Sequence, residues 1–190
     1  APADMSKLAR DTYAAYFRGG LNKTTRVNVL SRLPEAGVRL GIADATRYLI
    51  PNQVYSAESR VMPNRMDERE GKETANVERL GRAAEALQDA LCLSAPPAPG
   101  DDPVIYVFHA WPSEWDAGFS LLARGNFVVS SRMVAGKIPY VAMTSVAGGT
   151  CRISNPWPGV RPSLYVNGKR EGSLGGAVLS FVTTPGSKIV

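Results

Sequence analysis

One short stretch near the middle of the sequence limits what this chain can fold into. Residues 95–103 read Ala-Pro-Pro-Ala-Pro-Gly-Asp-Asp-Pro, with four prolines. Each proline removes a backbone donor and fixes φ, so the stretch is unsuited to a helix or a central strand. We therefore expect a helical segment at 1–95, a proline-rich linker at 96–103 and a second domain at 104–190.

The residues before this boundary repeat apolar side chains at helical spacing. The spacing predicts one helix over 5–17, a second from Pro34 to Pro51, and a third that ends at Ser94. Three helices do not close a domain, so their apolar faces require further partners. The apolar positions that carry these predictions are Leu8, Ala15, Val38, Ile42, Leu49, Leu80, Ala84, Leu87 and Leu91.

After the boundary the pattern changes to short β-type segments bounded by glycine and proline. The Asn167-Gly168 pair indicates a tight hairpin, because both residues tolerate positive φ. Several such segments in series favour an antiparallel β-sandwich, which makes the chain α+β. We expect strands at 104–108, 119–124, 127–134, 138–146, 151–154, 164–166 and 177–183.

The charge distribution argues against nucleic acid as a partner. The chain has 22 basic and 17 acidic residues, a net charge of +5, spread along both halves without a basic stripe. Such a mild excess is typical of an ordinary solvated surface. The sequence also has no apolar run of the roughly 18 residues that a membrane-spanning helix requires.

The chemistry-bearing residues do not form a metal or cofactor motif. Cys92 and Cys151 are far apart, and His109 is the single histidine, so we expect neither metal nor cofactor. The cysteines either pair in an oxidising compartment or remain two buried thiols. The opening Ala-Pro-Ala-Asp is similar to the residues that follow a signal-peptidase cut, which favours a secreted or extracytoplasmic location, although a processing or cloning boundary is an equal alternative.

Several motifs resemble, in their order, the C-terminal part of the glycoside hydrolase family 95 enzymes. They are Val104-Ile-Tyr-Val-Phe-His-Ala-Trp-Pro-Ser-Glu-Trp-Asp-Ala-Gly-Phe119, Leu122-Ala-Arg-Gly-Asn-Phe-Val-Val129 and Gly148-Gly-Thr-Cys-Arg-Ile-Ser-Asn-Pro-Trp157. The helix from Leu80 to Ser94 resembles the one that ends the (α/α)6 barrel of that family. The resemblance covers residues 62–158 and implies that this chain supplies the last helices of such a barrel, followed by an antiparallel β-sandwich.

The resemblance also implies a mechanism and a partner. Family members are several times longer than this chain and hydrolyse α-L-fucosides with inversion, using a carboxylic acid and a second carboxylate that activates water. The acid lies upstream of the matched segment, so the remainder of the enzyme, or a separate upstream chain, is the expected partner. Alone, this chain is expected to be inactive.

The family's base is an Asp in an Asp-Gly-Asn-Phe-Gly run, and counting back from Ser94 places it at Glu78. Here the surrounding residues are Val-Glu-Arg-Leu-Gly, so the motif itself is absent. Glu78 at the start of a helix is also favourable simply as a charge that complements the helix dipole. Asp67, Glu70 and Glu73 are the alternatives if the loop is shifted.

Four further residues are candidate sugar contacts. Asn64 and Arg65 fit a loop at a barrel mouth, and Trp111 offers an aromatic face to a sugar ring, with His109 beside it. Their ordinary interpretations are a solvated loop, a packing tryptophan and a hydrogen-bonded histidine. The alternative function is a noncatalytic carbohydrate-binding or interaction module, in which the sandwich and its tryptophans bind ligand; a structural chain without catalysis also remains open.

Overall fold

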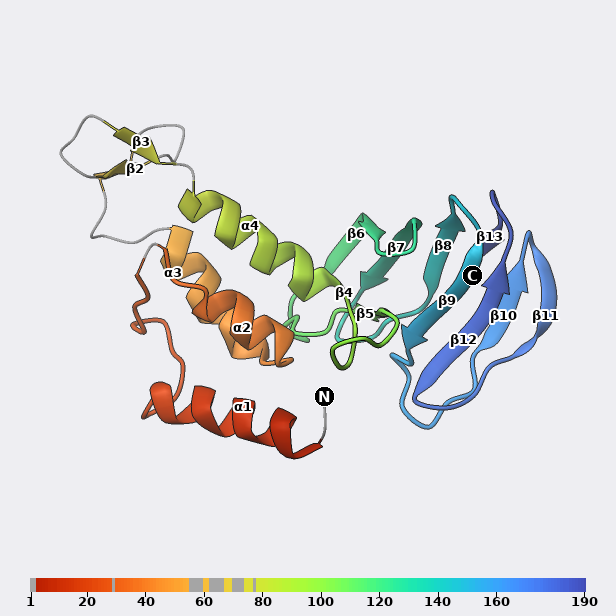
Figure 1. The fold of residues 1–190 in the computed structure, drawn as a ribbon, viewed down its shortest axis with the longest axis horizontal. Coiled ribbons are helices and arrows are strands. Elements are labelled where there is room, and N and C mark those ends of the chain that lie inside the picture. The colour runs from red at the N-terminus through yellow and green to blue at the C-terminus, as the bar shows by residue number, and fades with distance from the viewer. Residues whose placement is uncertain (1–2, 29, 55–59, 62–66, 70–73, 77) are drawn as a thin grey trace. The chain divides into compact units, whose positions relative to one another are not determined.

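The computed structural model describes residues 3–28, 30–54, 60–61, 67–69, 74–76 and 78–190 (Figure 1). The chain divides into two compact units. The helical unit contains the residues up to Ala90 together with His109–Pro112, and the sheet unit contains Leu91–Phe108 and Ser113–Val190. The α+β class expected from the sequence is confirmed.

The helices belong to the first unit. They are α1 (Ala3–Tyr16), α2 (Leu33–Arg39), the π-helix η1 (Ala45–Leu49), α3 (Ile50–Val54) and α4 (Glu78–Leu91). Three short strands, β1 (Arg60–Val61), β2 (Asp67–Arg69) and β3 (Thr74–Asn76), pair antiparallel in that order. None of the described helices has both the length and the apolar character needed to cross a bilayer.

Small residues allow the helices of this unit to pack closely. Ala83, Ala86 and Ala90 recur at three- and four-residue steps on one face of α4 and are buried. They join a core that also contains Val38 and Leu49, both fully buried. Alanine and valine side chains are short, so helix backbones approach more closely than leucine-lined faces permit.

Tyr13 attaches α1 to this core. Its ring is buried and lies 5.0 Å from the ring of Phe17. Its hydroxyl donates a hydrogen bond to the Leu33 carbonyl at 3.0 Å. The ring fills the space beside Gly37 of α2, where an added Cβ would lie 2.3 Å from the Tyr13 oxygen. Gly37 is therefore required by packing and not by backbone conformation.

The single helix expected from Pro34 to Pro51 is wrong, because the chain divides it into α2, η1 and α3. Gly41 has φ of 71° and donates to the Val38 carbonyl at 2.8 Å, while Ile42 donates to the Gly37 carbonyl at 2.9 Å. These two bonds are a Schellman motif, which ends a helix at a left-handed glycine. Pro51 lies in the first turn of α3, where a helix tolerates proline.

The sheet unit contains two β-sheets, one of six strands and one of four. The larger has the order β11-β10-β13-β8-β7-β6, and the smaller has the order β12-β9-β5-β4. All neighbours are antiparallel except the parallel pair β5 and β9. The strands are β4 (Cys92–Ala95), β5 (Val104–Val107), β6 (Ala117–Ala123), β7 (Phe127–Met133), β8 (Val141–Ser145), β9 (Gly149–Ser154), β10 (Ser163–Val166), β11 (Lys169–Ser173), β12 (Val178–Thr183) and β13 (Lys188–Ile189).

Buried side chains from both sheets meet between them. The Cys151 thiol of β9 lies 3.6 Å from the Met143 sulfur of β8, and the hydroxyls of Ser145 and Thr183 are 2.8 Å apart. Both cysteines are buried thiols, which is the second of the two alternatives left open by the sequence. Burial also raises the pKa of Cys151 to about 12, so this thiol is unreactive at neutral pH.

The sequence located the strands well and placed the change from helix to strand too late. The expected hairpin is present, with Asn167 and Gly168 at φ of 51° and 81° between paired Val166 and Lys169. The third helix ends at Leu91 instead of Ser94, because Cys92–Ala95 pairs with β5. Residues 96–103 contain no helix or strand and connect β4 to β5 within one sheet.

Two glycine substitutions test the close packing of the helical unit. Gly37→Ala places a methyl group against Tyr13, and such overpacking costs about 1–3 kcal/mol, more than the gain of about 0.5–1 kcal/mol in helix propensity. Gly81→Ala in α4 meets no atom within 4 Å, so it gains only the propensity. The melting temperature, followed by circular dichroism at 222 nm, should therefore fall for Gly37→Ala and rise for Gly81→Ala. A higher melting temperature for Gly37→Ala would contradict the close packing against Tyr13.

Candidate functional site

The candidate catalytic residue lies at the surface. Glu78 is the first residue of α4, and its side chain is exposed. Asn64 and Arg65 lie outside the described residues, as do Glu70 and Glu73, and only the backbone of Asp67 is described, in β2.

His109 and Trp111 both belong to the helical unit, although the residues on either side of them belong to the sheet unit. The chain turns at Phe108, which has φ of 52°, a strained value for an aromatic residue. Two residues later Ala110 is 1% exposed in the helical core, and the Trp111 ring packs against the same core. The packing interpretation of Trp111 therefore has structural support.

His109 contacts the C-terminal end of α2. Its Nε2 lies 3.2 Å from the Arg39 carbonyl oxygen, which can only accept, so Nε2 carries the proton. Gly41 leaves room for the ring, since a Cβ there would lie 3.2 Å from Cε1 of His109. Burial lowers the pKa of His109. The hydrogen bond to the Arg39 carbonyl raises this pKa in part, and the positive charge of Arg10 lowers it again. The imidazole is therefore neutral at pH 7.

The Arg39 side chain is the centre of a charged cluster that the sequence did not predict. Its Nε lies 3.1 Å from Glu35 Oε1, and its Nη2 lies 3.2 Å from Asp89 and 3.8 Å from Glu85. We call these four residues the Arg39 cluster. The cluster joins α2 to α4 and contains three carboxylates for one guanidinium.

Asp89 is the member of the Arg39 cluster whose pKa is shifted. Its side chain is 15% exposed, compared with 46% for Glu85. Burial raises the pKa of Asp89 above its usual value, the attraction of Arg39 lowers it, and the neighbouring carboxylates of Glu85 and Glu35 raise it again. Its Oδ2 is at ion-pair distance from Arg39 but accepts no well-aligned hydrogen bond. The ionised form of Asp89 is thus poorly solvated.

Glu78 is separate from this cluster. Asp89 lies eleven residues farther along α4, which corresponds to about 16 Å along a helix axis. A carboxylate pair for inverting glycoside hydrolysis requires about 6.5–9.5 Å. Glu78 and Asp89 therefore do not form such a pair, and a partner for Glu78 has to come from elsewhere.

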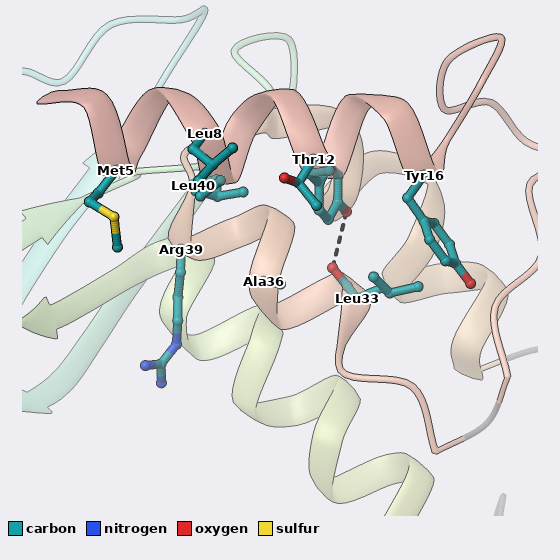
Figure 2. Close-up of a pocket in the computed structure, with 10 residues that line it drawn as sticks. Met5, Leu8, Thr12, Tyr16, Leu33, Ala36, Arg39 and Leu40 are labelled. Atoms are coloured by element: carbon teal, nitrogen blue, oxygen red, sulfur yellow. Dashed lines mark hydrogen bonds between the residues drawn. The ribbon is translucent and has the colours of Figure 1, made fainter.

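An apolar groove of about 600 Å³ lies between α1 and α2 (Figure 2). Figure 2 shows Met5, Leu8, Thr12 and Tyr16 along the side of α1 that faces α2. Met5, Leu8 and Tyr16 are 56%, 61% and 68% exposed. The groove contains few polar atoms, so it is unsuited to recognising sugar hydroxyls and suited to packing against apolar side chains.

A second hollow, of about 450 Å³, lies in the sheet unit and is more polar. It is lined by residues 154–155, 158–161 and 176–177. Trp157 is adjacent in the sequence but points its indole N–H to the Ile138 carbonyl at 2.6 Å. That indole is therefore committed to packing within the unit.

No metal site is formed by the described residues, where no three His, Cys, Asp or Glu side chains gather suitably. The chemistry available in the helical unit is that of carboxylates, one arginine and a neutral histidine. The sequence signal for the Arg39 cluster was present as two four-residue spacings, Glu35 to Arg39 and Glu85 to Asp89. Sequence alone does not say that α2 and α4 bring these pairs together.

Protein-family models give no match to this chain, and a search of curated proteins also gives none.

The raised pKa of Asp89 predicts a pH-dependent stability. A carboxyl whose folded pKa exceeds its unfolded value of about 4 contributes most stability below that value and loses it as pH rises through the folded pKa. Asp89→Asn removes this loss. Urea unfolding should therefore show the variant gaining stability relative to the parent protein between pH 4 and pH 7.

The control for this measurement is Asp101→Asn, which removes an exposed carboxylate from a loop of the sheet unit. Its stability difference from the parent protein should change little over the same pH range. If the difference in unfolding free energy between Asp89→Asn and the parent protein is constant from pH 4 to pH 7, burial does not raise the pKa of Asp89.

Proposed function

We propose that this chain contributes the last helices of an (α/α)6 barrel and the following β-sandwich to a secreted inverting glycoside hydrolase. The carbohydrate substrate would be cleaved by the assembly of this chain with an upstream chain. The proposal rests first on the resemblance of the ordered motifs to family 95 enzymes. It is supported by several features of the helical unit.

The observation that carries the proposal is the position of His109–Pro112. This segment follows β5 of the sheet unit and returns to the helical core, where Ala110 is buried and Trp111 packs. The resemblance implies a similar order of elements, in which the final barrel helix is followed by a strand and a turn that contains proline and tryptophan. Two independent modules joined by a simple linker would give no reason for such a return.

The apolar groove supports the expected upstream partner. The exposed apolar stripe on α1 leaves hydrophobic surface uncovered in the described part of the helical unit. Further helices of a barrel would cover surface of this kind. The (α/α)6 barrel itself remains part of the proposal.

In this proposal Glu78 is the general base. The exposed carboxylate of Glu78 at the first turn of α4 is accessible to water, as a base that activates a water molecule requires. The general acid would come from the upstream chain. Asn64, Arg65, His109 and Trp111 are the proposed sugar contacts.

A second candidate function is a noncatalytic carbohydrate-binding module. The observation that favours it is the polar hollow of the sheet unit, which is separate from the proposed catalytic residues. In this case the chain alone binds sugar and the sugar is not cleaved. The indole of Trp157 contributes through packing, since its N–H is already bonded.

The test is to purify the native assembly through a tag on this chain and to incubate it with α-L-fucosylated oligosaccharides. Light scattering gives its mass, and proton NMR identifies the first anomer released, which inversion predicts to be β. Glu78→Gln should lower kcat/KM by about 100-fold to 10,000-fold, because it removes the base without changing the side-chain shape.

Glu171→Gln is the matched control, since it removes another exposed glutamate, in β11 of the sheet unit. It should leave turnover and melting temperature unchanged. Equal turnover by Glu78→Gln and the parent assembly would refute the assignment of the base. A stable 20.4 kDa monomer that binds sugar without cleaving it would favour the binding module.

A further inference from the structure

Backbone hydrogen bonds connect the two chain segments that form the polar hollow of the sheet unit. One wall follows β9 and the other precedes β12. The Asn155 amide donates to the Ala177 carbonyl at 2.8 Å, and the Leu174 amide donates to the Pro162 carbonyl at 2.9 Å. A ligand would therefore find the hollow already formed, which reduces the entropic cost of binding.

The side chain of Asn155 fixes the shape of the hollow. Its Nδ2 donates to the Val160 carbonyl at 3.0 Å and to the Gly176 carbonyl at 3.2 Å. Its Oδ1 accepts from the Trp157 amide at 3.0 Å. The Asn155 amide nitrogen thus bonds once within its own wall and once across to Gly176, so recognition of a ligand falls to another residue.

Arg161 is the charged side chain that lines the hollow, and the other lining side chains are neutral. Its guanidinium lies over Gly175, where a Cβ would be 3.3 Å from Nε. Within the described part of the chain no carboxylate forms an ion pair with Arg161. An exposed guanidinium held at the wall of a hollow, with no internal counter-ion, favours an anionic ligand.

We propose that this hollow binds the carboxylate of an acidic sugar, with Arg161 as its anchor. The planar guanidinium matches a carboxylate with two parallel hydrogen bonds. Pro158 and Val160 on the loop wall supply apolar surface for the face of a sugar ring. The negative charge of the ligand follows from Arg161 itself, whereas the choice of a carboxylate carried by a sugar rests on the proposed carbohydrate function.

The test is a titration of the full ¹⁵N-labelled chain with D-glucuronate, followed by two-dimensional NMR. The amide signals of Gly159, Val160 and Gly176 should shift together and saturate. Arg161→Gln should weaken binding about tenfold or more, because it removes a charged hydrogen-bonding partner. Arg161→Lys keeps the charge without the planar pair of donors, so its affinity for D-glucuronate should lie between those of the parent chain and Arg161→Gln.

Arg124→Gln is the matched control, because it removes an exposed arginine at the turn after β6, away from the hollow-lining residues. It should bind D-glucuronate as the parent chain does. Signals far from both the hollow and the substituted residue should be unchanged in every variant, which separates loss of binding from loss of fold.

Three other probes decide what the hollow recognises. D-glucose lacks the carboxylate and should not bind, while acetate and inorganic sulfate should bind more weakly than D-glucuronate. If acetate binds with the same affinity as D-glucuronate, the sugar part of the proposal is wrong. If Arg161→Gln binds D-glucuronate as tightly as the parent chain, or if the parent chain does not bind it at millimolar concentration, the site itself is wrong. Because no cleavage is measured, failure of the proposed hydrolase activity is a separate result.

Discussion

The helical unit depends on one arginine. The Arg39 guanidinium contacts carboxylates of its own helix and of α4, while its backbone carbonyl accepts from His109. Three segments distant in the sequence are therefore connected through a single residue. Removing the charge would leave Glu85 and Asp89 without this partner and Glu35 with Arg32 alone, which lies 3.3 Å away, and like charges in a partly buried site repel strongly. The arrangement of α2, α4 and residues 109–112 follows from this connection and from alanine packing.

Local patterns in the sequence predicted most of the elements. The alternation in β7 and β8, the Asn167-Gly168 turn and the alanine and leucine spacing of α4 each express a short-range preference. The break after Arg39 was missed although Gly41 is visible, because a helix pattern continued beyond it and only the Schellman bonds decide the end. The strand at Cys92–Ala95 was missed because pairing with β5 overrides the helical periodicity that precedes it.

The candidate site was predictable only in part. His109 and Trp111 were proposed from their motif, and their position on the helical unit depends on a turn at Phe108 that no propensity predicts. The Arg39 cluster needed knowledge of which helices pack together. Arg161 was missed for a different reason: one arginine in a glycine-rich loop has no distinctive spacing, and its significance comes from the hollow that Asn155 holds open.

The two hollows differ in the physical chemistry of what they can hold. The groove beside α1 is apolar and wide, so its binding energy would come from burying surface, and only a partner with its own apolar stripe gains from it. The hollow beside Arg161 offers less apolar area than the groove and contains one charged side chain, so specificity there comes from that charge. We propose that assembly falls to the helical unit and carboxylate recognition to the sheet unit, and the charge on Arg161 separates the second role from the hydrolysis proposed for Glu78.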